Sequence, residues 1–526
     1  MKKNNILSIP KTELSEAPSD EVLELELDDL IPDFGEFHFE STKDISPRSF
    51  ASLQLRAASA VKTLFRTSDS LLLLCGSGSV DLISTACDLV YENVGLKPTV
   101  AYAPTKFEMF GDDKTEGILT ESGCVVMPCS HLIDHPKRLG MMDACLNLNA
   151  GLKLILCGDA TDCAQLLMMW PQLENALHAD LVTEFSATGA LRIMAGLIAS
   201  YRAKSEVRDF DFESVRLLCY YGCRVSGDRR WLGLPEIKLK QLIRQADLYA
   251  GSSALVKAHN VLKAIGADDF RANYLAEAEL RDHRDKQILM STQGQVVGQI
   301  NGLSVIETSG TSYVYGEPVR ITATLRAGGE GDVIDIERKA ELAGQIHAKA
   351  MMIINGFLTK EFGSQQPLPV SASLVFEQSY SEIDGDSASL TGLCAVISCL
   401  ACVPIRQDLA VTGAVDQFGD VQSVGGVNEK IEGFFRICRL HGFNGTQGVI
   451  IPKSCVHQLM LRPSVIRAIK EGKFHIYTVS HVTGATKLLL SLPWGEPDVP
   501  DSVCGMICEH LDELLNHDMK PWWHFW

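Results

Sequence analysis

The sequence lacks any long apolar run and any surplus of basic residues. Apolar stretches such as Leu71–Cys75 and Leu488–Leu492 are far shorter than the roughly 20 residues that cross a bilayer. The opening residues MKKNNILSIPKTELSEAPSDE contain no stretch typical of a signal peptide. We therefore expect a cytoplasmic protein without a transmembrane segment. A net charge of −18 argues against a nucleic-acid partner, because binding to phosphates requires a basic face.

A disulfide scaffold and a metal centre are also not expected. Sixteen cysteines in 526 residues should be free thiols in a reducing compartment. Cys399 and Cys402 form a CxxC pair, but they lie in the apolar helical stretch GLCAVISCLACV without a second thiol or histidine pair. We interpret them as small core residues, with metal binding or redox chemistry as the alternative.

The order of helical and strand patterns predicts an α/β domain followed by an α+β domain. The α/β domain alternates a helix at Ser46–Phe65, with Ser46 as N-cap, with buried strands at 71–75, 123–128 and 152–158. The expected segments are an N-terminal lead-in (1–45), the α/β domain (46–195), a helical lid (196–290), the α+β domain (291–498), and an amphipathic helix with an aromatic tail (499–526).

The α+β domain begins with Gly- and Val-rich strands from Gly294 onward. The elements expected after them are a helix at Ile336–Phe362, a strand at Val370–Phe376, a helix after Ser387, a hairpin around Gln417–Asp420, a helix after Asn428, and strands at 448–452 and 474–479.

Two segments of this domain carry residues that suggest catalysis. In the first, strand residues end at Asp384-Gly385-Asp386-Ser387 and a helix follows at once. A serine in the first helical turn lies near unpaired backbone N–H groups that stabilise an oxyanion, and the glycine permits a tight approach. Considered alone, the segment also fits a simple helix cap.

In the second segment, TGAVDQFGDVQSVGGVNEKIEGFF, a strand carries Thr412 and the first turn of a helix carries Lys430. A cation is disfavoured at a helix N-terminus. Together with burial, this lowers the expected pKa of the lysine toward that of a general base. A Ser–Lys pair activates a serine without histidine. Considered alone, Lys430 also fits a solvated surface lysine.

Residues 294–492 resemble the proteolytic domain of the Lon protease family, particularly its B-type branch. The resemblance rests on GQINGLSV, IERKAELAGQIHAKAMMI, FEQSYSEIDGDSAS and the TG…VGGVNEKIEGFF block, in the family's order. It implies that Ser387 is the nucleophile and Lys430 the general base. It also implies that Thr412 hydrogen-bonds and orients the lysine.

The same resemblance gives supporting roles to the residues before the serine. Asp384 matches an acidic position that can pair with the lysine in inactive states, and Gly385 and Asp386 complete the motif. Histidines have no role in this chemistry.

The upstream half, from FHFESTKDI onward, resembles the AAA+ module of the same branch, but its nucleotide motifs are missing. A P-loop requires GxxxxGK[ST], whereas residues 71–84 are LLLLCGSGSVDLIS, with no lysine after the glycines. The acidic pair that holds Mg²⁺ is replaced by GCVVMPCS at 123–130. We therefore expect a degenerate AAA+-like module with a helical lid and no cofactor, because the missing residues argue against ATP–Mg²⁺ binding.

The expected function is that of a Lon-type serine endopeptidase that cleaves unfolded or flexible protein segments without ATP hydrolysis. The family forms hexameric rings, so the resemblance implies a homohexamer. Two alternatives stay open: an ATP-dependent unfoldase-protease with nonstandard nucleotide binding, and a non-catalytic ring scaffold.

Two further segments suggest contacts with other chains. KFEMFG (106–111) fits a pore-facing loop or, alternatively, a loop anchored in the core. The last residues include Trp522, Trp523, Phe525 and Trp526. Such a cluster predicts docking on this chain, on a neighbouring subunit or on a membrane.

Overall fold

The computed structural model describes residues 21–518, apart from 113, 122, 150, 205, 309, 311–312, 364–367 and 380–382. One compact unit combines the described residues up to Ile31 with those from Arg271 onward, and the other is Pro32–Phe270. We call these the α+β unit and the α/β unit. Within the described ranges, no helix is long and apolar enough to cross a membrane.

The α/β unit is built on a five-stranded parallel sheet with the order β3-β4-β5-β2-β6. Its strands are β2 (Leu71–Cys75), β3 (Thr99–Val100), β4 (Cys124–Pro128), β5 (Lys153–Gly158) and β6 (Leu177–Asp180). The three predicted strands are thus confirmed to within one residue.

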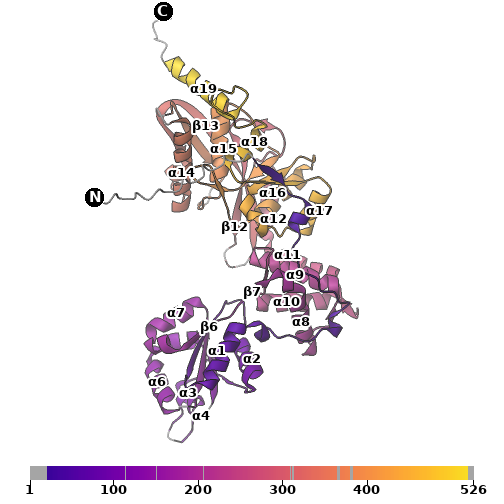
Figure 1. Ribbon diagram of the computed structural model, residues 1–526, viewed down its shortest axis with the longest axis vertical. Coiled ribbons are helices and arrows are strands. Elements are labelled where there is room, and N and C mark those ends of the chain that lie inside the picture. The colour runs from indigo at the N-terminus through magenta and orange to yellow at the C-terminus, as the bar shows by residue number, and fades with distance from the viewer. Residues whose placement is uncertain are drawn as a thin grey trace, which may run out of the picture. The chain divides into compact units, whose positions relative to one another are not determined.

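Helices cover both faces of this sheet (Figure 1). Alternate strand residues pack against α1 (Leu55–Arg66) and α2 (Leu82–Val94) on one face. On the other face they pack against α5 (Cys129–Ile133), α6 (Leu139–Leu148) and α7 (Ala160–Met169). Burial on both faces explains why the strands are nearly continuous apolar runs.

The first helix begins at Leu55, so the predicted start at Ser46 is wrong. Residues 46–50 are not helical. The Arg48 N–H donates instead to the carbonyl of Gly196 at 2.9 Å, which holds this segment against α8 (Ala190–Ala203). A tertiary hydrogen bond therefore overrides the capping pattern.

The second part of the α/β unit is helical, as the sequence predicted. It contains α8, α9 (Phe212–Ser226), α10 (Glu236–Tyr249) and α11 (Ala258–Ala272). Two small sheets not expected from the sequence join β7 (Glu184–Ser186) to β9 (Trp231–Gly233) and β8 (Asp209–Phe210) to β10 (Leu255–Val256). The unit ends at Phe270 rather than at residue 290, because α12 (Tyr274–Arg284) packs on α16 (Val427–His441) of the α+β unit.

The segment suggested as a pore-facing loop contains a short helix, α3 (Lys106–Phe110). Met109 is fully buried and Phe110 packs on the core of the α/β unit. Phe107 is 52% exposed. Of the three apolar side chains of this segment, Phe107 alone is exposed enough to contact another chain.

The α+β unit is built on a mixed seven-stranded sheet with the order β1-β20-β19-β16-β12-β13-β14. Four strands are mutually parallel: β12 (Gln299–Glu307), β16 (Leu409–Val411), β19 (Gly448–Pro452) and β20 (His475–Val479). The others run antiparallel to their neighbours: β1 (Val22–Glu24), β13 (Val314–Asp335) and β14 (Val370–Phe376). The predicted strands at 370–376 and 448–452 are confirmed.

Strand β1 was not expected, because residues 1–45 were interpreted as a lead-in. It pairs with β20, with Val22 opposite Val479. The three residues VLE are too few and too exposed to give a strand pattern in the sequence.

The expected single helix at 336–362 is divided into α13 (Ile336–Lys339) and α14 (Gln345–Phe362). Glu341 lies between them with φ of 59°, a left-handed conformation that a continuous helix cannot contain. The helix expected after Ser387 is α15 (Ser389–Ala401), and all of its residues are buried.

The C-terminal helix α19 (Val503–Asp518) packs on α15 (Figure 1). Five apolar residues of this helix are buried or packed on the core, whereas Leu515 is 42% exposed. The five are Val503, Met506, Ile507, Leu511 and Leu514. The aromatic residues 522–526 lie outside the described residues.

The CxxC pair is divided between core and surface. Cys399 is buried, whereas Cys402 is exposed and ends α15 with φ of 53°. Its sulfur lies 3.4 Å from Nδ1 of His510. All sixteen cysteines are free thiols.

Candidate active site

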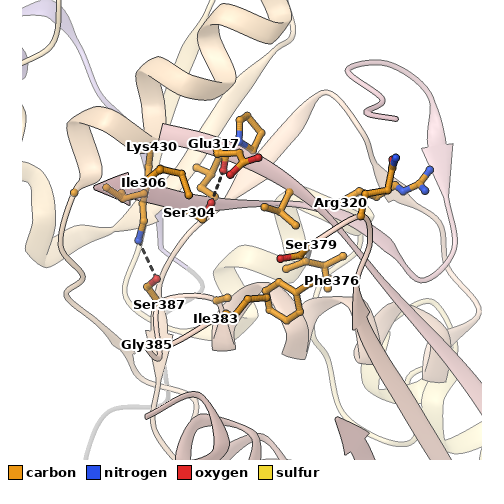
Figure 2. A pocket seen from close by; sticks show the side chains of 18 of the residues that line it. Ser304, Ile306, Glu317, Arg320, Phe376, Ser379, Ile383, Gly385, Ser387 and Lys430 are labelled. Carbon is orange, nitrogen blue, oxygen red and sulfur yellow. Dashed lines mark hydrogen bonds between the residues drawn. The ribbon is translucent and has the colours of Figure 1, made fainter. Parts of the chain in front are cut away.

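The structure brings Ser387 and Lys430 together. Ser387 lies in the turn before α15, and Lys430 lies in the first turns of α16. The Nζ of Lys430 donates to the Oγ of Ser387 at 2.9 Å (Figure 2). The serine precedes the helix by two residues instead of lying in its first turn, and strand β14 ends well before it, at Phe376.

The backbone of Ser387 is held by the segment that follows β16. Its carbonyl accepts from the N–H of Gly413 at 2.9 Å and from the Oγ1 of Thr412 at 3.3 Å. Two residues on, the Oγ of Ser389 accepts from the N–H of Val415 at 3.0 Å. The family resemblance implied a bond from Thr412 to Lys430. In this structure the threonine hydroxyl positions the serine instead.

Asp384 caps the helix α14 from outside that helix. One carboxylate oxygen accepts from the N–H groups of Ile346 and His347 at 3.1 and 3.2 Å. The helix has Gly344 at its N-cap, without a side chain to make this bond, and a Cβ on Gly344 would overlap the Asp384 carboxylate. The suggested pairing of Asp384 with Lys430 is not the arrangement found here.

We predict that Asp384→Ala lowers the unfolding free energy by about 1 kcal/mol, because α14 loses its cap. It should also reduce peptide cleavage, because the loop leading to Ser387 loses its anchor. Asp384→Asn keeps an oxygen acceptor and should retain most of the stability and most of the peptide cleavage. Melting temperature and kcat/KM of the two variants provide the test. Equal losses in Asp384→Asn would show that the charge matters, as pairing with Lys430 requires.

Gly385 and Asp386 connect this anchor to the serine. Gly385 has φ of 115°, a value that an L side chain rarely adopts. In the part of the chain that the structure describes, the N–H groups of Asp386 and Ser387 make no hydrogen bond. These two donors are therefore available to an oxyanion formed next to the serine.

The helix that carries Lys430 is anchored at its start. Its N-cap, Gly426, has φ of 65° and lies against Val305 so closely that a Cβ would lie 2.5 Å from a methyl carbon. Two residues along, Asn428 bonds both to the carbonyl of Gln458 at 2.8 Å and to the N–H of Met460 at 2.6 Å. These contacts fix the direction of the lysine.

Burial makes Lys430 a weaker base than an ordinary lysine. The residue is 4% exposed, and burial lowers its pKa to about 8, although the charges of Cys455 and Asp386 oppose the shift. About a tenth of the lysine is therefore a neutral amine at pH 7, and about half near pH 8. That form can accept the proton of the serine.

A groove of about 1040 Å³ opens onto the pair. One wall is formed by residues of β12 and β13, including Ser304 and Ile306 (Figure 2). The opposite wall is residues 376–379 and 383–388, and residues 424–426 close the end beside the lysine. The groove is large enough for several residues of an extended peptide.

Comparison with known proteins agrees with this geometry. Residues 283–491 match the model of the Lon protease (S16) C-terminal proteolytic domain. This part of the chain is a Lon proteolytic domain. It contains the groove-lining strands, the serine turn and the helix of Lys430.

The Lon relatives extend beyond that domain. A Lon protease homolog of Escherichia coli K12 is 42% identical over 378 residues, which are 70% of this chain and 64% of the relative. A Lon protease homolog of Haemophilus influenzae is 38% identical over 384 residues, which are 71% of this chain and 63% of the relative. An archaeal Lon protease of Archaeoglobus fulgidus is 29% identical over 279 residues, which are 53% of this chain and 42% of the relative. The chain thus spans less than two thirds of the length of these relatives.

Sequence reasoning missed the residues that hold the Lon site in place. Asn428 lies two residues after the glycine pair, but nothing in the sequence indicates its partner. Glu432 likewise accepts from the N–H of Arg462 at 2.8 Å. Gly344 leaves room for the Asp384 carboxylate. The sequence does not show this role, because the two residues are far apart in the chain.

Proposed function

We propose that this chain is a serine endopeptidase of the Lon type that uses Ser387 as nucleophile and Lys430 as general base. The 2.9 Å contact between Lys430 Nζ and Ser387 Oγ carries the proposal. The burial of the lysine and the adjoining groove support it, because a base must be neutral and a substrate must reach the serine.

The reaction proceeds in two halves. Neutral Lys430 takes the proton as Ser387 Oγ bonds to the scissile carbonyl carbon, and the N–H groups of Asp386 and Ser387 stabilise the oxyanion. The protonated lysine then gives its proton to the leaving amine as the C–N bond breaks. Water, deprotonated by the same lysine, hydrolyses the acyl-enzyme and regenerates the serine.

The substrates we propose are unfolded or flexible protein segments, because the groove beside the pair has room for an extended chain. A homohexameric ring follows from the resemblance to the family, and molar mass in solution tests it. A non-catalytic scaffold is the competing function. Labelling of Ser387 by a fluorophosphonate, absent in Ser387→Ala, separates the two.

We further propose that the α/β unit is a degenerate AAA+-like module that works without nucleotide. In parallel α/β sheets, ligands bind at the carboxyl ends of the strands, which places a nucleotide at the loop between β2 and α2. In this chain, that loop has neither a lysine nor the hydroxyl that follows it in a P-loop.

Several backbone donors in and next to this loop are already occupied. The Asp81 N–H donates to Oε2 of Glu236 at 3.3 Å, and the Ser84 N–H donates to Asp81 Oδ1 at 3.0 Å. The Gly76 N–H donates to the carbonyl of Gly158 at 3.0 Å. Two carboxylates therefore lie where phosphates would have to approach, and they would repel them.

We predict that peptide cleavage does not depend on ATP–Mg²⁺ and that the protein has no ATPase activity. The measurements are hydrolysis of a quenched peptide with and without nucleotide, phosphate release, and melting temperature at millimolar ATP–Mg²⁺. A ligand that binds the folded state raises the melting temperature. A nucleotide-dependent rise coupled to phosphate release would instead support an ATP-dependent unfoldase-protease.

A further inference from the structure

We infer that the groove beside Ser387 selects a lysine or arginine side chain of the substrate through the carboxylate of Glu317. The inference rests on the proposed peptidase function and names a substrate class for it. The geometry around Glu317, the charge of the groove and its apolar floor carry the argument.

Glu317 follows Gly316, a residue that packs directly against the backbone at Lys430. Gly316 lies so close to the backbone of Glu429 and Lys430 that a Cβ added to it would be 2.8 Å from the backbone nitrogen of Lys430. Glu317 itself is opposite Ser304 on β12, whose hydroxyl donates to the Glu317 carbonyl at 2.9 Å. Figure 2 shows Glu317 on the same wall as Ser304 and Ile306, and Lys430 lines the same groove.

The lining of the groove is strongly acidic. Six carboxylates face two cations, Arg320 and Lys430. The carboxylates are Asp282, Glu307, Glu317, Glu377, Asp384 and Asp386. Two of them already have partners: Asp384 caps α14, and Glu377 accepts from Thr322 at 2.8 Å and lies 4.0 Å from Arg320. The excess negative charge favours a cationic side chain in the groove.

The Glu317 carboxylate is among those left without a partner. It accepts no hydrogen bond from any residue that the structure describes. Burial, and then the nearby charge of Glu279, raise the pKa of Glu317 to about 7, while His283 partly offsets the shift. A cation brought by the substrate would supply the missing counter-charge.

Two buried polar residues, Glu279 and His283, lie near the Glu317 carboxylate. Glu279 and His283 are 8% and 2% exposed, with Oε1 of the glutamate 3.6 Å from Nε2 of the histidine. Glu279 Oε2 and both ring nitrogens have no hydrogen-bond partner among the described residues. The charge of Glu279 acts on Glu317, and a bound ammonium or guanidinium would offset the negative charge of the two carboxylates.

A lysine or arginine fits this site better than a metal ion. In the described part of the chain, no group of three potential ligands is arranged to hold a metal. The groove is also lined by Leu303, Ile306 and Val319. A long side chain can pack its methylene groups on these residues while its charged end reaches Glu317.

The test uses quenched peptides that differ at one position, which carries lysine, arginine, norleucine or glutamine. Each of the three positions on either side of the cleaved bond is varied in turn. We expect kcat/KM for lysine to exceed that for norleucine about tenfold at one position. In Glu317→Gln this ratio should fall to within about twofold of unity.

Glu377→Gln is the matched control, because its carboxylate already has partners, and it should keep the ratio. A wild type that cleaves the norleucine peptides but prefers lysine at no position would overturn the inference and leave the peptidase function intact. A preference that survives in Glu317→Gln would also overturn it. Cleavage of no peptide at all would contradict the peptidase function itself.

Discussion

Ser387→Ala is expected to abolish peptide cleavage while the protein remains folded. Loss of a serine nucleophile typically lowers kcat by a factor of roughly 10⁴ or more, because the remaining groups cannot replace the covalent step. The hydroxyl is contacted by Lys430 and supports no strand or helix bond. We therefore expect the unfolding free energy to change by about 1 kcal/mol or less. Peptide hydrolysis and thermal melting measure the two effects.

Ser389→Ala is the matched control for this experiment. The Ser389 hydroxyl is buried and satisfies the N–H of Val415, so its loss should lower the melting temperature while most of the activity remains. The two serines are thus expected to separate catalysis from stability. Turnover by Ser387→Ala at the wild-type rate would show that another residue is the nucleophile.

Lys430→Arg is expected to be inactive, because a guanidinium stays protonated and cannot accept the serine proton. In the wild type, activity should rise with pH as a single proton leaves the lysine, with a midpoint near the pKa of about 8. The pH profile of kcat/KM measures this midpoint. A flat profile between pH 6 and about 9 would contradict the assignment of Lys430 as base.

Lys430→Met shows whether inactivity results from lost chemistry or from unfolding. The folded state lowers the lysine pKa from 10.5 to about 8, so between these values the unfolded chain binds more protons and stability rises with pH. At pH 7 the buried ammonium therefore destabilises the fold, by up to about 3 kcal/mol. Lys430→Met removes this cost and should be inactive but more stable. A strongly destabilised Lys430→Met would indicate a structural lysine.

The dyad could be predicted from the sequence because it depends on local features. A glycine turn precedes each helix, but each segment alone also fitted a helix cap or a surface lysine. The resemblance of both segments to the Lon family was needed to select Ser387 and Lys430. Their contact required only that both helices begin at the same end of the sheet. Strands β14 and β19 were predicted for the same reason, because each is a short apolar run bounded by turn residues.

The supporting contacts could not be predicted, because they join residues that are distant in the sequence. Thr412 bonds to the serine backbone, Asp384 caps a helix on another segment, and Glu317 lies near Glu279 and His283 of α12. In each case the residue type fits several partners and the fold selects one. The break at Glu341 was missed for a similar reason, since the residues on both sides of it favour helix.

The pairing of β1 with β20 also determines the order in which the molecule can be completed. Thr478 donates to the carbonyl of Leu23 across a separation of 455 residues, so the edge strand must wait until nearly the whole chain has been synthesised. At roughly 5–20 residues per second, this delay is on the order of tens of seconds. During that time the α/β unit can fold alone, as an insertion between two parts of its neighbour. The N-terminal strand is then the last piece of the sheet to be added, and a ribosome-bound chain stalled before β20 should leave Val22–Glu24 open to proteases.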